Sequence, residues 1–526
     1  MSDLAGTVAL ARFMLRRDRI LLAIFVVIAA GFVIVTATSF QDLYPTAADR
    51  ARFAATIEGN ATYDALYGPA IGLDSIGGLT AWRTGGSLAA MIGLVNLLLV
   101  GRHTRAEEER GRTELVRAAA IGRRAPVAAA LAVVAATDLA IAVVAALGLI
   151  AAGLPTDGSL LLGASLGAVG LVFAATGAVA AQLTETARAA NGLAGTALGA
   201  AYLLRAVGDS NDGTLSWLSP IGWGRETHAF AGDRWWPLLL CLAATAALVT
   251  AAFALLARRD LGAGLIPSRP GPATAGPGLS GSLGLAFRLQ RGGLLAWSAG
   301  MLVVGAAVGS IGTDARDLID SSNQIRDVLI HGGGDITDAF FASLFLLLAL
   351  MATGFTISSS LRLHGEEVAG HTELLLSTPV ARLRWAGGHL LIAMAGSVVV
   401  LLATGLGTGL AYALGSHDAG ALPRLVGAAL AQLPAAWVLG ALVAALYGLA
   451  PRAVTLAWAV LAACVLLWLV GPLVDAPQWV LDLSPYEHVP GVPAEALAVG
   501  PMLALTALAA ALTTAGLVGF RRRDVT

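Results

Sequence analysis

The sequence predicts an all-α integral membrane protein with twelve transmembrane helices, arranged as two parallel six-helix repeats. Three observations support this prediction: a low charge content, a series of long apolar runs, and a charged loop motif that occurs twice. Only 13% of the 526 residues are charged, whereas about a quarter are charged in a soluble globular domain. The mean hydropathy is +0.77, and uncharged residues gather in runs near the roughly 20 residues that cross a bilayer core.

The apolar runs define the expected spans. The first run, Ile20–Thr38, is longer than the roughly 7–15 apolar residues of a signal peptide, and no clear cleavage site follows it, so we interpret it as a permanent span. Runs rich in Leu and Ala satisfy their backbone hydrogen bonds in lipid as helices, and they lack the alternation of outer-membrane barrel strands. The expected spans are 20–38, 82–100, 126–152, 160–181, 190–207, 237–257, 292–311, 339–361, 385–414, 423–448, 454–474 and 499–520.

Arginine indicates the orientation. All 33 basic residues are arginine, and most lie in alternate loops, with a dense cluster from Arg102 to Arg124. Cytoplasmic loops carry the excess of basic residues, so we expect a multi-pass protein of a bacterial cytoplasmic membrane with both termini cytoplasmic. A Pro- and Gly-rich stretch without a packed element separates the halves. The expected parts are residues 1–257 (first half), 258–290 (cytoplasmic linker) and 291–526 (second half).

One loop of each half carries the same motif. The loop after the second expected span and the loop after the eighth both contain E-E-x-x-G-x-T-E-L, followed by an arginine eight residues later. Self-similarity at a fixed spacing indicates a structural repeat. The motif residues are Glu107, Glu108, Gly111, Thr113, Glu114, Leu115 and Arg123 in the first copy, and Glu366, Glu367, Gly370, Thr372, Glu373, Leu374 and Arg382 in the second.

Weaker similarity extends beyond these loops. Leu218–Pro220 resembles Leu483–Pro485 before the last span of each half, and Arg258–Asp260 resembles Arg522–Asp524 after it. Each half therefore enters and leaves on the same side, which is typical of parallel repeats related by an axis along the membrane normal.

The motif predicts a short helix on the membrane surface. Residues 107–120 are mostly helix formers, with acidic residues early and Arg117 late, as the helix dipole favours. In the second copy, Thr378 and Pro379 predict the N-terminus of the ninth span. A surface helix joined to two spans can transmit a push into the membrane. The alternative is a solvated connector that only maintains orientation, but orientation requires Arg and not the repeated Glu.

At these residues the chain resembles the permease subunits of ABC-2-type transporters. Their loop between spans two and three carries E-x-x-G-T-x-E-L-L-x-T-P-x-x-R or a close variant. The first copy departs from the pattern, with Ala119 and Ala120 where Thr-Pro would stand. The second copy follows it at Glu367, Gly370, Thr372, Glu373, Leu374, Leu375, Thr378, Pro379 and Arg382.

The fused two-half layout is similar to that of large actinobacterial permeases associated with polyketide or polyether antibiotic and multidrug export. The resemblance implies a type V exporter-like fold and ATP-driven export of apolar or amphiphilic small molecules. It implies that both loops are coupling helices docked to a separate ATPase, two copies per chain. It also implies short external re-entrant helices at about 208–236 and 475–498, where interfacial Trp anchoring is the alternative.

Catalytic chemistry is not expected in this chain. The sequence has no G-x-x-x-x-G-K-[ST] motif, so ATP and Mg are expected in the partner, with no cofactor and no metal here. The candidate substrate pathway residues are Asn96, Asp138, Phe355 and Trp458. Asp138 lies in a span, where an ionisable group serves either a pathway or a structural hydrogen bond. Gly195 and Gly199 have the spacing of close helix packing.

Two other functional classes are alternatives to an ATP-driven exporter. A proton-coupled secondary transporter of the major-facilitator type also has twelve spans in two halves, but its loop between spans two and three is short, with Asp-Arg where this chain has Glu. ATP dependence of transport separates the two classes. A membrane-embedded enzyme would need converging catalytic side chains on its spans, and the sequence contains no such cluster.

Overall fold

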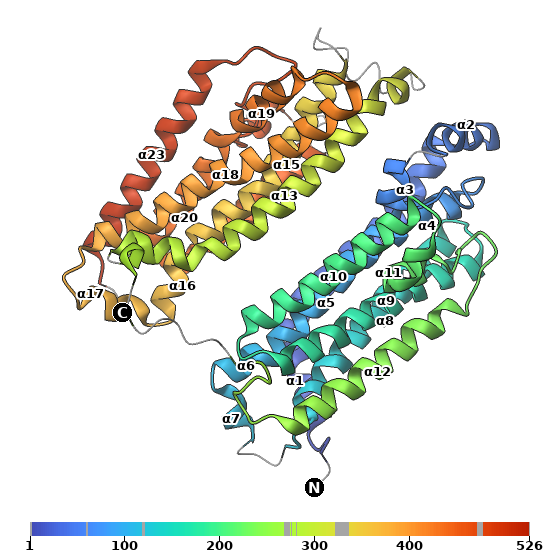
Figure 1. The fold of residues 1–526 in the computed structure, drawn as a ribbon, viewed down its shortest axis with the longest axis horizontal. Coiled ribbons are helices and arrows are strands. Elements are labelled where there is room, and N and C mark those ends of the chain that lie inside the picture. Colours follow the sequence, from blue (N-terminus) through green and yellow to red (C-terminus); the bar gives the residue numbers. More distant parts are fainter. Residues whose placement is uncertain are drawn as a thin grey trace. The chain divides into compact units, whose positions relative to one another are not determined.

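The computed structural model contains only helices as regular elements in the residues that it describes (Figure 1). The chain divides into two compact units, Met1–Gly271 and Pro272–Thr526. The division falls inside the stretch 258–290, which the sequence predicted to be a linker. Each unit is considered by itself below. The described residues are 3–58, 61–117, 121–267, 274, 276–279, 281–320, 336–470 and 477–524.

The first unit is a bundle of long helices with shorter helices at both ends. Its long helices are α1 (Thr7–Leu43), α5 (Ser87–His103), α8 (Ala125–Ala151), α9 (Thr156–Leu183), α10 (Ala187–Asp209) and α12 (Pro237–Arg258). Its shorter helices are α2 (Ala47–Ile57), α3 (Ala61–Tyr67), α4 (Ile76–Gly85), α6 (Arg105–Glu109), α7 (Arg112–Arg117), η1 (Thr214–Leu218) and α11 (Pro220–Arg225).

The second unit has a similar order of elements. Its longer helices are α13 (Ser282–Asp320), α15 (Ile336–Ser360), α18 (Arg382–Ser416), α19 (Ala421–Ala431), α20 (Leu433–Leu449), α21 (Leu456–Val470) and α23 (Val499–Arg522). Its shorter helices are η2 (Pro277–Leu279), α16 (Arg362–Val368), α17 (His371–Leu376), η3 (Pro451–Ala453) and α22 (Gln478–Leu481).

Ten helical stretches of the described residues are long and apolar enough to cross a membrane, so the chain is a multi-pass membrane protein. The two other expected spans, 190–207 and 454–474, coincide with α10 and α21. Helix α10 has the length of a span but is less apolar, and α21 is apolar but has only 15 residues. Residues 471–474 lie outside the described part. The number twelve therefore stays a prediction.

Equivalent helices pack together in the two units. In the first unit α1 packs on α8, α5 on α9, and α9 on α12. In the second unit α13 packs on α18, α15 on α20, and α20 on α23. In each half, therefore, the first expected span packs on the third, the second on the fourth, and the fourth on the sixth. The similarity that the loops indicated therefore extends to the helix packing.

Small residues allow the closest crossings. Helices α20 and α23 meet at Gly448 and Gly516, where a Cβ added to Gly448 would lie 1.9 Å from the carbonyl oxygen of Gly516. Within the first unit, a Cβ at Gly195 or Gly199 of α10 would meet nothing within 4 Å, so close packing at these glycines stays a prediction.

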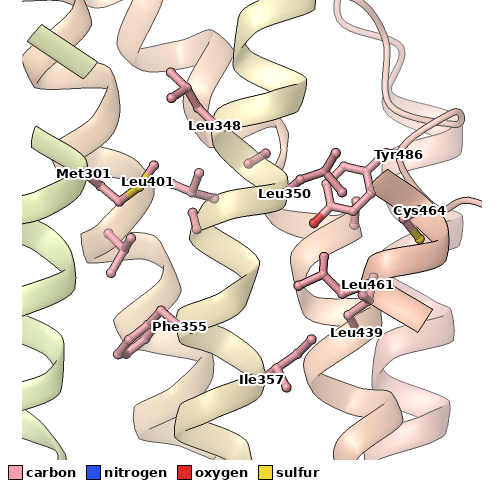
Figure 2. Close-up of a cluster of buried hydrophobic side chains, with 14 of the residues drawn as sticks. Met301, Leu348, Leu350, Phe355, Ile357, Leu401, Leu439, Leu461, Cys464 and Tyr486 are labelled. Carbon is pink, nitrogen blue, oxygen red and sulfur yellow. The ribbon is translucent and has the colours of Figure 1, made fainter. Parts of the chain in front are cut away.

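The segments that the sequence predicted to be external fold back onto the bundles. Ser219 and Ile221, at the start of α11, are fully buried in the first unit. In the second unit the ring of Tyr486 enters a core of aliphatic side chains, and its hydroxyl pairs with Thr353 of α15 (Figure 2). Short helices η1, α11 and α22 are present in these segments. Their re-entrant character remains a prediction.

Sequence reasoning missed the helices between the first two spans. Helix α2 begins with a capping box in which Thr46 and Asp49 each bind the other's backbone N–H. Trp82, which was expected to begin the second span, lies in the separate helix α4 and donates from Nε1 to the carbonyl of Gly68 at 2.8 Å. The T-x-x-D pattern at Thr46 was the available signal for α2.

Candidate coupling site

The repeated motif forms two short helices in each unit. We define the first coupling segment as α6 and α7 (Arg105–Arg117) and the second as α16 and α17 (Arg362–Leu376). The single helix predicted over 107–120 is interrupted at the motif glycine. Gly111 has φ 70° and Gly370 has φ 74°, a conformation that side chains with a Cβ rarely adopt. The glycine is therefore needed for the turn. Residues 118–120, with Ala119 and Ala120, lie outside the described part.

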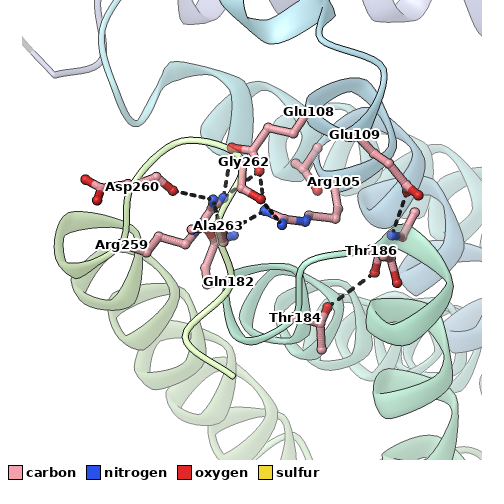
Figure 3. Close-up of polar contacts among 12 residues, drawn as sticks. Arg105, Glu108, Glu109, Gln182, Thr184, Thr186, Arg259, Asp260, Gly262 and Ala263 are labelled. Carbon is pink, nitrogen blue, oxygen red and sulfur yellow. Dashed lines mark hydrogen bonds and ion pairs between the residues drawn. The ribbon is translucent and has the colours of Figure 1, made fainter. Parts of the chain in front are cut away.

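The second glutamate of the motif is the centre of a buried ion-pair network in the first unit (Figure 3). Nη2 of Arg259 donates to both carboxylate oxygens of Glu108 at 2.9 Å, and Nη1 of Arg105 donates at 2.6 Å. The three side chains are at most 8% exposed. Arg259 directly follows α12, so these charge-assisted bonds attach the coupling segment to the end of that helix.

The second unit repeats this attachment. Nη1 and Nη2 of Arg523 donate to the two carboxylate oxygens of Glu367 at 2.6 and 2.5 Å. Arg523 directly follows α23, which corresponds to α12 in the first unit. The hydrogen bonds to Glu367 raise the pKa of the Arg523 guanidinium. The bidentate geometry holds the segment in one orientation relative to the helix end.

The motif arginine completes the arrangement in both units. Nη2 of Arg123 donates to the backbone carbonyl of Arg259 at 2.6 Å, and Nη1 of Arg382 donates to that of Arg523 at 2.9 Å. We call the glutamate, the helix-end arginine and the motif arginine together the clamp. Sequence reasoning noted the motif and the paired arginines separately but did not connect them. Their recurrence in both halves was the signal.

The remaining motif residues separate into inward and outward sets. Thr113 and Thr372 are buried. Both first glutamates pair with residues of their own segment, and Glu107 also pairs with Arg17 of α1 at 3.1 Å. Glu114 and Glu373 are exposed, and Leu374 is 72% exposed. The side chain of Leu115 lies outside the described part. The inward residues hold the segment in place, and the outward residues present an acidic and apolar surface.

The predicted start of the ninth span was wrong. Helix α18 begins at Arg382, and the N-cap residue before it, Ala381, makes no side-chain cap. The hydroxyl of Thr378 donates instead to the carbonyl of Leu375 at 2.5 Å, which closes the end of α17. The connection is therefore longer than Thr-Pro alone predicted, and Arg382 reaches the clamp from the first turn of α18.

Of the four candidate pathway residues, the structure brings two together. Nδ2 of Asn96 on α5 lies 3.0 and 2.8 Å from the two carboxylate oxygens of Asp138 on α8, and both side chains are buried. Phe355 is 3% exposed in the core of the second unit (Figure 2). Trp458 on α21 is 41% exposed. The described residues contain no group of three metal-ligating side chains.

Comparison with known proteins places the chain in a family. The family model of the C-terminal domain of the multidrug efflux system permease Rv1217c matches residues 279–521. The multidrug efflux system permease protein Rv1217c of Mycobacterium tuberculosis strain H37Rv is 42% identical over 528 aligned residues, which cover 100% of this chain and 96% of the relative. The chain belongs to this family of multidrug efflux permeases. The resemblance to multidrug export permeases is thereby confirmed.

Within this permease family, the match includes the second coupling segment with Glu367 and Arg382, since Arg362 to Arg382 lie inside residues 279–521, whereas the helix-end Arg523 lies just beyond the matched residues. The alignment with the relative also covers the first coupling segment. The roles of the individual motif residues remain predictions.

Proposed function

We propose that this chain is the permease subunit of an ATP-driven ABC exporter that moves apolar or amphiphilic small molecules, such as antibiotics or drugs, out of the cell. The supporting relative is a multidrug efflux permease. The observation that carries the proposal is the matched pair of coupling segments. Each is clamped to the end of a long helix, while Glu114 or Glu373 faces outward. Both segments and both termini would lie in the cytoplasm.

The clamp explains how a push on a coupling segment would enter the membrane. In the first unit the segment continues from α5, binds Arg259 at the end of α12, and reaches α8 through Arg123. A displacement of the segment therefore moves three helix ends together, because buried charge-assisted bonds resist separation. One ATPase would dock at each segment, which gives two ATPase subunits per chain. ATP and Mg would bind to those subunits.

Charge reversal at the outward glutamates tests the proposal. We expect the Glu114→Arg, Glu373→Arg double variant to insert and fold normally, since surface substitutions typically change stability by less than about 0.5 kcal/mol. Drug transport driven by ATP in proteoliposomes should fall about tenfold or more, because an attraction between each glutamate and a basic residue of the ATPase would become a repulsion between like charges, at a cost of several kcal/mol.

The matched control is Glu58→Arg, which reverses an exposed glutamate at the C-terminal end of α2. Its transport should equal that of the unmodified chain. Unchanged transport by the double variant would remove the coupling role of the motif, and a one-to-one complex with the ATPase would contradict the stoichiometry.

One observation favours the alternative, a proton-coupled secondary transporter. Asp138 is a buried carboxyl group within a candidate span, and such groups occur in proton pathways. Its contact with Asn96 equally supports a structural hydrogen bond. Transport in proteoliposomes separates the alternatives. The exporter requires ATP and the ATPase without a proton gradient, whereas the secondary transporter requires the gradient and no ATP.

A further inference from the structure

A pocket of about 410 Å³ opens beside the second coupling segment. One wall is α16, with His364, Glu367 and Val368. The η3 turn between α20 and α21 also lines it, with Arg452, and Arg523 completes the lining. All of these residues belong to the second unit, and most of them lie outside the repeated motif.

The pocket has more positive charge than its own residues neutralise. Arg523 is paired with Glu367, but Arg452 is exposed and has no carboxylate within ion-pair distance in the described part of the chain. Two buried nitrogens in the lining, Nδ1 of His364 and Nε of Arg523, have no hydrogen-bond partner. Buried polar atoms are nearly always paired, so the unpaired Nε–H of Arg523 beside an unneutralised arginine indicates a missing acceptor.

The first unit identifies the chemistry of that acceptor. His364 stands three residues before Glu367, as Arg105 stands before Glu108. In the first unit the segment 262–266 packs against Arg105, and the N–H groups of Leu265 and Ile266 donate to the carbonyls of Gln182 and Leu183. This segment supplies oxygen atoms to the basic side chains (Figure 3).

The oxygen contacts of the first unit are short and specific. Nη2 of Arg105 donates to the carbonyl of Gly262 at 2.7 Å, and the carbonyl of Ala263 accepts from Arg105 at 3.1 Å and from Arg259 at 3.0 Å. In the second unit, the described residues place no such segment against His364 and Arg523. A ligand with several oxygen acceptors and a negative charge would complete the second site in the same way.

We propose that this pocket binds the phosphate group of an anionic phospholipid. The phosphate oxygens would accept hydrogen bonds from Arg452 and Arg523, and from His364 when its Nδ1 carries a proton. Basic pockets between transmembrane helices bind anionic headgroups in this way. The site is independent of the energy source for transport.

The surroundings favour a lipid over a soluble anion. The pocket lies where α20 and α23 end and α21 begins, and Arg521 and Arg522 of α23 are exposed there. On either side of η3, Leu449 is 65% exposed and Leu456 is 56% exposed, which gives acyl chains an apolar surface next to the phosphate site. A free phosphate ion would use the charges but not these leucines.

Native mass spectrometry of the purified full-length chain with added phosphatidylglycerol or phosphatidylcholine tests the proposal. We expect the unmodified chain to retain one phosphatidylglycerol more strongly than phosphatidylcholine. Arg452→Gln should weaken this binding about fivefold, the effect of one arginine near an anionic lipid surface. His364→Gln should weaken it in the same direction. The matched control Arg384→Gln, at an exposed arginine in the first turn of α18, should leave it unchanged.

Two additional ligands identify the source of the acceptor. Inorganic phosphate at millimolar concentration should give no thermal stabilisation. A stabilisation as large as that by phosphatidylglycerol, lost in Arg452→Gln, would overturn the lipid assignment in favour of a soluble anion. A synthetic peptide with the sequence of residues 260–266 represents the occupant of the first unit. Tighter binding of this peptide than of phosphatidylglycerol would overturn the proposal, as would equal lipid retention by the variants and the unmodified chain.

Discussion

The two coupling segments share a clamp but differ in how completely it is buried. In the first unit, Glu108 is held by both Arg105 and Arg259, and residues 262–266 cover the site. In the second unit, Arg523 is the one arginine that pairs with Glu367 among the described residues, and the pair borders an open pocket. The motif thus preserves the attachment of each loop to its last helix, whereas the surroundings of that attachment have diverged. The attachment of the loop to the last helix is common to both halves, whereas the cover over the attachment is present in the first half only, among the described residues.

Removal of the clamp glutamate should affect the two units unequally. Glu108→Ala leaves two buried arginines without their carboxylate, so we expect the protein to lose about 3–5 kcal/mol of unfolding free energy. Glu367→Ala leaves one arginine that borders the pocket, and a loss of about 1.5–3 kcal/mol is expected. Thermal unfolding of the two variants in the same detergent measures the difference, with Glu58→Ala as the control. Equal losses would show that the additional burial in the first unit is without energetic effect.

The polar pairs inside the bundles provide the next contrast. Asn96→Leu leaves the buried Asp138 carboxyl group without its hydrogen bonds and should cost about 1–3 kcal/mol. Ser397 occupies the position of Asp138 in the second repeat, where it accepts from Nε1 of Trp437. Ser397→Ala should cost less than about 1 kcal/mol, because the Trp437 nitrogen also lies 3.3 Å from the carbonyl of Met394. Denaturation in mixed micelles would reveal the order, and a larger effect for Ser397→Ala would contradict it.

Substitution of the motif glycine should have the same effect in both units, because Gly111 and Gly370 adopt the same backbone conformation. Gly111→Ala and Gly370→Ala each place a Cβ on a backbone with positive φ and should cost about 1–2 kcal/mol. Neither Cβ would meet an atom within 4 Å, so the cost is conformational in both units.

Gly365→Ala is the matched control for these two variants. This glycine lies within α16 with open space around it, so alanine should stabilise the helix by about 0.5–1 kcal/mol. Melting temperatures that fall for Gly111→Ala and Gly370→Ala and rise for Gly365→Ala would support the conformational explanation. A fall for all three would indicate that any side chain in these segments is harmful.

Prediction from the sequence succeeded where local patterns decide the structure. Ten of the expected spans correspond to long apolar helices, because length and composition alone determine whether a segment can cross a bilayer. Hydropathy predicted α10 less well, because this helix is less apolar than the other expected spans. Its packing on α5 and α9 is a tertiary contact that hydropathy does not reveal. Local helix signals also misplaced the start of α18, since Thr378 closes the preceding helix instead of opening the next.

What the sequence by itself determined is the kind of protein and the existence of two related halves, because hydropathy and repeated spacing are properties of the chain alone. Only the tertiary structure decided what the motif residues do. Glu108 and Arg259 are 151 residues apart, and Glu367 and Arg523 are 156 apart. No local pattern pairs residues at such separations, because helix packing brings them together. The fold also decided that one clamp is covered and that the other borders a pocket.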